Sequence, residues 1–260
     1  MARRINVTTV RMVLVAGLSL GLSGYANAQT LTEFSSEARF QLDLQVPDAG
    51  VKPFLPQGWS MNVATQGAAK DCNLRLIFVD RVTINAPDGK PVGTNRLAYL
   101  AVPVKDASGA NAQLVIGGLT ADPKDAPGPF GNYLPATTHT MRRSTSSNGS
   151  GPTIDTQDWE FRAATGERLE MHIEYERGVG NKGALNEVKF YSGKDPSKYQ
   201  ISKQEQVLEI LRNPTTNPPD RVKKFSFKGS GGSYAKIFDG TERVVSWDNI
   251  LWINRSVLLP

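Results

Sequence analysis

Hydrophobic and polar residues alternate strictly in two stretches of the chain, residues 36–46 and residues 168–176. The apolar positions are Ala38, Phe40, Leu42, Leu44 and Val46 in the first stretch and Leu169, Met171, Ile173 and Tyr175 in the second. A side-chain period of two is that of a β-strand with one buried face. We therefore predict two half-buried strands. The core residues that we expect to be buried are Leu42, Leu44, Leu169, Ile173 and Phe227.

Shorter apolar or alternating runs, bounded by turn residues, predict further strands. These runs are residues 73–84, 96–104, 113–119, 159–163, 187–192, 222–228, 234–238, 243–247 and 251–258. Asp88-Gly89, Asp106 to Gly109, Gly229 to Gly232 and Asp239-Gly240 supply turns between them. The strands do not alternate with long helices, so a doubly wound parallel sheet is disfavoured.

Two segments favour helix. Residues 47–54 begin at Pro47 and are long enough for one or two helical turns. In residues 199–212 the apolar side chains Ile201, Val207, Leu208 and Leu211 approximate a period of 3.6, and Asn213-Pro214 would end the helix. We expect Tyr199 to Arg212 to form the best helix of the chain.

These elements predict a mainly β protein. We expect residues 29–260 to form one domain, either an antiparallel β-barrel or β-cone or a two-sheet sandwich, with one or two flanking helices. Residues 120–153 are rich in Pro, Gly and Ser and are expected to form a long excursion with one strand at about 133–143. A loop of this length in a compact domain is usually functional or mobile.

The first 28 residues predict an export signal. Three arginines precede an apolar run at residues 12–22, and Ala26-Asn27-Ala28 places small residues where signal peptidase cleaves. The run is too short to span a membrane, and no cysteine follows it for lipid attachment. We expect cleavage after Ala28 and a periplasmic or secreted protein; Arg3-Arg4 leaves a twin-arginine signal as an alternative.

Removal of this leader changes the charge. The net charge of the whole chain is +5, and the leader holds three arginines and no acid, so the mature chain has +5 − 3 = +2. The mature chain has no long basic stripe, which argues against nucleic acid or an anionic membrane as a partner. The single cysteine, Cys72, excludes an internal disulfide. We expect Cys72 to be a small buried side chain.

Several features resemble the acetoacetate decarboxylase-like superfamily. They are Val46-Pro47, the segment Phe54-Leu55-Pro56-Gln57-Gly58-Trp59, and late strands with Phe238-Asp239-Gly240 and Leu251-Trp252. The resemblance implies a β-cone around an apolar pocket. In decarboxylases of that superfamily a lysine forms a Schiff base with the substrate. A second lysine beside it, together with desolvation, lowers its pKa.

The sequence departs from that superfamily in its lysines. The resemblance implies a lysine pair in the middle of the chain, but no such pair occurs between residues 106 and 200. The pair that does occur is Lys223-Lys224. Lys223 would share a strand face with Phe225 and Phe227 and is therefore the candidate for a pocket lysine. The alternative is an edge strand with solvated lysines.

Other residues supply two further candidate groups. Glu170, His172 and Glu174 lie on one face of the predicted strand and could bind a metal or act in acid–base catalysis; alternatively this face points to water. His139, Arg142 and Arg143 could anchor an anionic group such as a carboxylate, with a solvated hairpin as the alternative. No zinc motif is present, and no glycine-rich loop precedes a helix, so we expect no cofactor.

Three functions remain open from the sequence. The first is an exported small-molecule-binding protein of acetoacetate decarboxylase-like fold that acts on a carbonyl or keto-acid compound in an internal pocket, as a lyase if it is an enzyme. The second is an envelope ligand-binding module without turnover. The third is a metal-dependent lyase or hydrolase that uses Glu170, His172 and Glu174.

Overall fold

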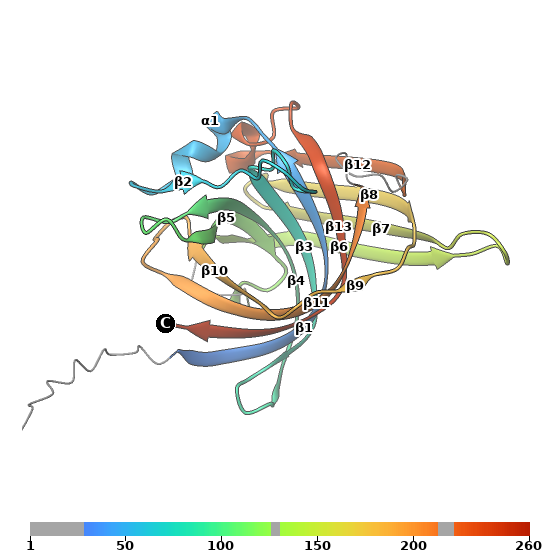
Figure 1. Ribbon diagram of the computed structural model, residues 1–260, viewed down its shortest axis with the longest axis horizontal. Coiled ribbons are helices and arrows are strands. Elements are labelled where there is room, and N and C mark those ends of the chain that lie inside the picture. Colours follow the sequence, from blue (N-terminus) through green and yellow to red (C-terminus); the bar gives the residue numbers. More distant parts are fainter. Residues whose placement is uncertain (1–28, 126–130, 213–220) are drawn as a thin grey trace, which may run out of the picture.

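The computed structural model describes residues 29–125, 131–212 and 221–260. The expected leader at residues 1–28, residues 126–130 of the expected excursion, and Asn213-Pro214 lie outside the described residues. Most of the described chain is strand, joined in one thirteen-stranded sheet (Figure 1). Within the described residues, no helix has both the length and the apolar character needed to cross a bilayer.

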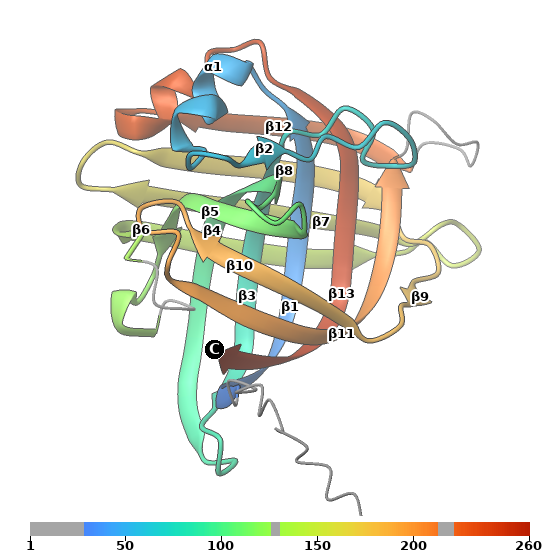
Figure 2. The same cartoon turned by 60° about the vertical axis from the view of Figure 1, so that its left-hand side comes forward.

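Seven strands of the sheet close into a ring. Their order around the ring is β5 (Asn111–Thr120), β10 (Asn186–Ser192), β11 (Tyr199–Arg212), β13 (Arg243–Leu259), β1 (Thr30–Gln45), β3 (Leu74–Asn85) and β4 (Pro91–Lys105), which pairs again with β5. All neighbours are antiparallel except β5 and β10. The ring encloses its own interior, and Figure 2 shows the strong curvature of its strands.

The other large strands form an arm that leaves the ring at β5. The arm consists of β6 (Tyr133–Ser146), β7 (Ile154–Ala163), β8 (Arg168–Glu176) and β12 (Val222–Ser230). Both views show these strands crossing the outside of the ring strands (Figures 1 and 2). The smaller elements are α1 (Asp48–Val51), the 3₁₀ turns η1 (Lys52–Phe54), η2 (Pro123–Asp125) and η3 (Gly232–Lys236), and the two-residue strands β2 (Ser60–Met61) and β9 (Asn181–Lys182).

The main hydrophobic core lies between the ring and the arm. Phe78 of the ring packs against Trp159 and Phe161 of the arm, with ring centroids 5.7 and 6.3 Å apart, and Phe40 packs against Tyr175 at 6.3 Å. The expected core residues Leu42, Leu44, Leu169 and Ile173 are fully buried, and Phe227 is half-buried. The prediction of a mainly β fold is confirmed. The ring is closed, as in a barrel, and the arm packs against it, as in a two-sheet sandwich. The structure thus has features of both architectures that the sequence left open.

The prediction of a helix at Tyr199 to Arg212 is wrong. These residues form β11, which pairs antiparallel with β10 and β13. Gln200, Ser202 and Gln204 are polar yet buried, because they face the interior of the ring. The sequence interpretation assigned such residues to the exposed side of a helix, whereas a polar ring interior accepts them on a strand.

The expected helical turns after Pro47 and the strand within the excursion are present. Asp48 to Phe54 form α1 and η1, and the expected strand at 133–143 extends to Ser146 as β6. The strand pairing of β6 with β7 therefore uses part of the serine-rich stretch that was expected to be loop.

Candidate functional site

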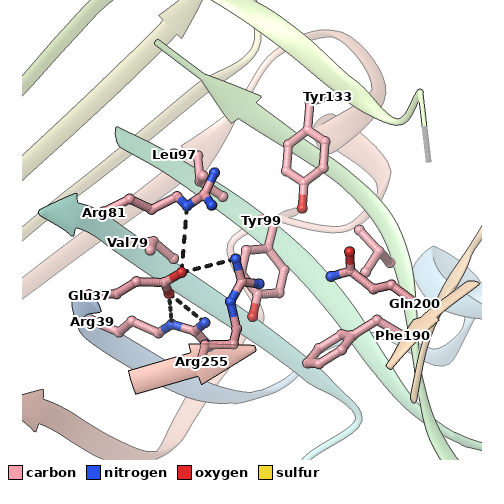
Figure 3. Close-up of a pocket in the computed structure, with 11 residues that line it drawn as sticks. Glu37, Arg39, Val79, Arg81, Leu97, Tyr99, Tyr133, Phe190, Gln200 and Arg255 are labelled. Carbon is pink, nitrogen blue, oxygen red and sulfur yellow. Dashed lines mark hydrogen bonds and ion pairs between the residues drawn. The ribbon is translucent and has the colours of Figure 1, made fainter. Parts of the chain in front are cut away.

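Two hollows lie inside the ring of strands and share three of their lining residues. The small hollow has a volume of about 10 Å³ and is shown in Figure 3; the large hollow has a volume of about 240 Å³. Arg39, Tyr99 and Phe190 line both. The small hollow has room for about one water molecule, whereas the large hollow can hold a small organic molecule. The ring interior is therefore the candidate functional site.

Strand alternation brings charged side chains into this interior. On β1 the even-numbered Phe40, Leu42 and Leu44 enter the core between ring and arm, so Glu37 and Arg39 on the opposite face enter the ring. On β13 a bulge between Ile250 and Ile253 shifts the alternation by one residue. In a regular strand Asp248 and Arg255 would lie on opposite faces, because an odd number of positions separates them. The bulge allows both to line the interior.

Glu37 is the centre of a buried cluster of arginines. Its carboxylate accepts a hydrogen bond of 2.7 Å from Arg39 Nε, and it lies 3.0 Å from Arg255 Nη2 and 3.5 Å from Arg81 Nε (Figure 3). Burial alone would raise the pKa of Glu37. Attraction to Arg255, Arg39 and Arg81 and a hydrogen bond from Ser35 outweigh burial and lower this pKa to about 2. Glu37 is therefore ionised throughout the neutral range.

The arginine cluster carries more positive than negative charge. Glu33 pairs with Arg81 and with Arg255, so two carboxylates face three guanidinium groups. The side chains of Arg39, Arg81 and Arg255 are 6%, 1% and 5% exposed. Burial lowers the pKa of Arg255, and repulsion from Arg39 and Arg81 acts in the same direction. A buried surplus of one positive charge favours a ligand that brings an anion.

Neutral polar groups complete the wall of the ring interior. Tyr99 and Tyr133 line the small hollow, and burial raises the pKa of the Tyr133 phenol, which keeps it protonated. The side-chain oxygens of Gln113 and Gln200 are buried and accept no hydrogen bond from the described residues. Gln200 is 3% exposed, and Figure 3 shows its amide pointing into the small hollow. A buried polar group without a partner costs about 1–3 kcal/mol, so a polar ligand can recover that free energy.

A pair of aspartates lies at the large hollow. Gln41 Nε2 donates hydrogen bonds to Asp43 at 2.9 Å and to Asp248 at 3.4 Å, which brings the two carboxyl groups together. Arg75 Nε lies 3.4 Å from Asp43. Burial and repulsion from Asp43 raise the pKa of Asp248 to about 7, and burial raises the pKa of Asp43 as well. The pair therefore holds a proton near neutral pH.

The structure places Lys223 away from the ring interior. β12 is the edge strand of the arm and has a bulge between Val222 and Lys224. Lys223 Nζ lies 3.3 Å from Glu176, and Lys224 donates a hydrogen bond of 2.9 Å to Glu174. The lysines thus lie on an edge strand exposed to solvent, which is the alternative stated above. Within the described part of the chain, no lysine lines either hollow of the ring.

Glu170, His172 and Glu174 occupy the outward face of β8. The core face of that strand is Leu169, Met171, Ile173 and Tyr175, all buried. The three polar side chains bind separate partners: Glu170 pairs with Arg162 and Arg168, His172 with Asp158 at 2.7 Å, and Glu174 with Lys224. No group of three or more histidine, cysteine or acidic side chains among the described residues can hold a metal ion. The metal hypothesis therefore has no support from the described geometry.

The structure separates His139, Arg142 and Arg143. Arg142 shares an open surface hollow of about 570 Å³ with Glu170 and His172 on the outward face of the arm. His139 lies on the other face of β6, where its ring is 6.4 Å from that of Phe161. Arg143 is exposed and contacts Gln157. Arg142 and His172, which the sequence placed in different candidate groups, thus line the same hollow. His139, Arg142 and Arg143 all lie outside the ring.

Cys72 is a buried free thiol beside the aspartate pair. Its Sγ donates a hydrogen bond of 3.4 Å to the Leu74 carbonyl. Burial, and then repulsion from Asp43, raise its pKa to about 12. The side chain is therefore a thiol and not a nucleophilic thiolate at neutral pH, in agreement with the expected small buried side chain.

The sequence interpretation missed the residues that line the ring. One signal for them was available: the polar face of the strand at 36–46 carries Glu37, Arg39 and Asp43, charges of both signs at spacings of two to four residues. In a closed ring of strands the inward face can be polar. The sequence pattern suggested a functional polar face for the strand at 168–176. The polar face that points into the ring is instead that of β1.

Comparisons with known proteins agree with this architecture. No family model matches the sequence, and no curated protein matches it. One solved structure with a similar fold is the enduracididine biosynthesis enzyme MppR, complexed with the condensation product of pyruvate and imidazole 4-carboxaldehyde. Its TM-score is 0.51 at 10% identity, over 96% of this chain and 96% of that chain. A second is an acetoacetate decarboxylase-like enzyme from Sphingomonas wittichii RW1, with a TM-score of 0.51 at 11% identity over 93% and 97%.

This chain has the acetoacetate decarboxylase-like fold. The resemblance noted in the sequence is confirmed at the level of the fold. At such low identity the likeness carries no residue roles, so the chemistry of the site depends on the side chains of this chain.

Proposed function

We propose that this protein is exported and binds a small carboxylate-bearing molecule, such as a short keto acid, inside its ring of strands. The observation that carries the proposal is the buried arginine cluster, in which three guanidinium groups face two carboxylates. Arg39 borders the large hollow as well as the small one, so it is the arginine of this cluster that can reach a ligand there, whereas Arg75 of the same hollow is paired with Asp43. A carboxylate at Arg39 would balance the surplus charge and accept charge-assisted hydrogen bonds.

The proposed binding does not use a Schiff base. That chemistry requires an amine that is uncharged at neutral pH and in contact with the substrate carbonyl. Within the described residues the walls of both hollows hold arginines and no lysine, and arginine stays protonated. The neighbour MppR was solved with a molecule that derives from pyruvate, which supports a small carbonyl acid as the first class of ligand to test.

Calorimetric titration with pyruvate and longer keto acids tests the proposal. Arg39→Gln should weaken binding by about 10- to 100-fold, the loss expected for a hydrogen bond to a charged group. The variant should stay folded because Glu37 keeps Arg81 and Arg255 as partners. Arg142→Gln on the outward face of the arm is the matched control and should leave the affinity unchanged.

Three results would contradict the proposal. If the wild-type protein binds none of these acids, the ring interior is not a carboxylate site. If binding survives Arg39→Gln, the ligand lies elsewhere. Borohydride reduction in the presence of pyruvate should leave the mass of the protein unchanged, and a labelled lysine would establish covalent chemistry instead.

Export is a separate part of the proposal and has its own test. Intact mass and N-terminal sequencing of protein recovered from the periplasm or medium should give a chain that begins at Gln29. A recovered protein that retains residues 1–28 would refute export but would leave the binding proposal untouched.

A further inference from the structure

The large hollow is bounded by charges of opposite sign. Arg39 of β1 and Asp248 of β13 both line it. In the pairing of β1 with β13, Arg39 lies opposite Ile250 and Gln41 lies opposite Asp248. Arg39 and Asp248 are therefore diagonal neighbours, with Cα atoms about 7–8 Å apart. A ligand that contacts both needs its two polar ends several bonds apart.

The side of the hollow at Asp248 offers more acceptors than donors. Asp43 and Asp248 share one cation, Arg75, and Ser246 and Gln41 donate to the carboxyl oxygens. Apart from Arg39, the other described side chains that line the hollow come from β3, β4, β5, β10, β11 and β13, and the titratable one among them is Tyr99. None of these is a cation, and the Cys72 thiol next to Asp43 is uncharged.

A second observation points to a ligand rich in N–H donors. The side-chain oxygen of Gln113, which lines the large hollow, accepts no hydrogen bond from the described residues, and the same holds for Gln200 deeper in the ring. The Gln200 side chain lies in the small hollow and is almost fully buried, with 3% exposure. Free acceptors on the wall of the ring suit an ammonium group, which has three donors and no acceptor.

The proton held by the aspartate pair agrees with this preference. Burial first, and then repulsion from Asp43, raise the pKa of Asp248 to about 7. An ammonium group in the hollow favours the ionised carboxylate and would expel that proton. A second carboxylate there would add repulsion and would require the proton to stay.

We propose that the ring interior selects small molecules with a carboxylate at one end and an amino group several bonds away, with Asp248 as the residue that recognises the amine. This inference rests on the proposed function, because Arg39 must hold the carboxylate. It adds the ligand class and the specificity-determining residue, neither of which the fold alone assigns.

Three ligands with the same five-carbon chain differ in the group at the end far from the first carboxylate. They are 5-aminovalerate, valerate and glutarate, which end in an ammonium group, a methyl group and a second carboxylate. Calorimetry at pH 7 should show 5-aminovalerate binding at least about tenfold more tightly than valerate, and glutarate more weakly than either. Binding of 5-aminovalerate should also release protons, which makes its measured enthalpy depend on the ionisation enthalpy of the buffer.

Asp248→Asn removes the recognising charge and keeps the shape of the side chain. In this variant the preference for 5-aminovalerate over valerate should disappear, the affinity for valerate should be unchanged, and the buffer dependence should vanish. Asp158→Asn, at a half-buried aspartate on the outward face of the arm, is the matched control and should change none of these.

The outcomes distinguish this inference from the proposed function. If valerate and 5-aminovalerate bind wild type equally, the selection for an amine is refuted while carboxylate binding stands. If the preference persists in Asp248→Asn, another group recognises the amine and the role of Asp248 is overturned. If binding of 5-aminovalerate to wild type releases no protons, the role of Asp248 in recognising the amine is overturned as well. If neither keto acids nor these three ligands bind, the proposed function fails.

Discussion

Replacement of Asp248 by asparagine should change how the stability of this protein depends on pH. Asp248 ionises with a pKa of about 7 in the folded protein, against 3.8 for an ordinary aspartate. Between these two values the folded protein binds more protons than the unfolded chain. Its free energy of unfolding therefore falls as the pH rises from about 4 through 7, and the contribution from this source levels off above about pH 8. Asparagine has no proton to lose, so the variant lacks this decline.

The expected magnitude follows from the difference in pKa. Each unit of pH within the interval changes the free energy of unfolding by about 1.4 kcal/mol. Between pH 5 and pH 8.5 wild type should lose about 2–3 kcal/mol that the variant keeps. Asp43 titrates together with Asp248, and its pKa should fall when the like charge is removed, so its own contribution in the variant is smaller. Glu37 stays ionised across this range because its pKa is about 2.

Urea unfolding at pH 5.0, 6.0, 7.0 and 8.5 measures the effect. The quantity to compare is the free energy of unfolding of Asp248→Asn minus that of wild type, which should rise by about 2–3 kcal/mol across the series. Asp88→Asn is the control, because Asp88 is an exposed turn residue whose pKa is lowered by its hydrogen bonds to Lys90 and thus titrates below the range. A difference that stays constant within about 0.5 kcal/mol from pH 5.0 to 8.5 would show that Asp248 carries no proton near neutrality.

Two further predictions concern the core and the arginine cluster. Leu169→Ala should lower the free energy of unfolding by about 2–5 kcal/mol, because Leu169 is fully buried between ring and arm. The control Leu185→Ala, at a side chain that is 72% exposed, should change it by less than about 0.5 kcal/mol. Equal effects of the two changes in urea unfolding would contradict this placement of β8. Glu37→Gln should lower the free energy of unfolding by about 3–5 kcal/mol, since three buried guanidinium groups lose their central carboxylate, and a loss below about 1 kcal/mol would show that the cluster is hydrated.

Local patterns were sufficient to predict most of the strands. Alternation in residues 36–46 and 168–176 reports which side chains share a face, and this depends only on backbone geometry. The apolar faces so identified are the buried ones, as Leu42 and Leu169 show. The short helical turns after Pro47 could be predicted for the same reason, because proline presets the backbone of a first turn.

Residues 199–212 mark the limit of such patterns. Four apolar residues among Gln, Glu and Lys fit a helix period, and no local signal contradicted it. The strand β13 pairs with β11 along most of its length, β10 pairs with residues 199–204 on the other edge, and the ring interior accepts Gln200, Ser202 and Gln204. Tertiary contacts thus override a weak local preference.

Local sequence patterns account for the strand-rich character of this protein, the apolar faces of its main strands and the resemblance in fold. The direction in which the polar faces point depends on long-range strand pairing. Alternation shows that Arg39 and Asp43 lie opposite Phe40 and Leu42, but it does not say whether that opposite side is water or a closed interior. Pairing of β5 with β10 and of β1 with β13 closes the ring, and this closure joins segments more than 70 residues apart in the chain. Lys223, Glu170 and His172 face outward for the same reason, because the arm has a core on one side and solvent on the other.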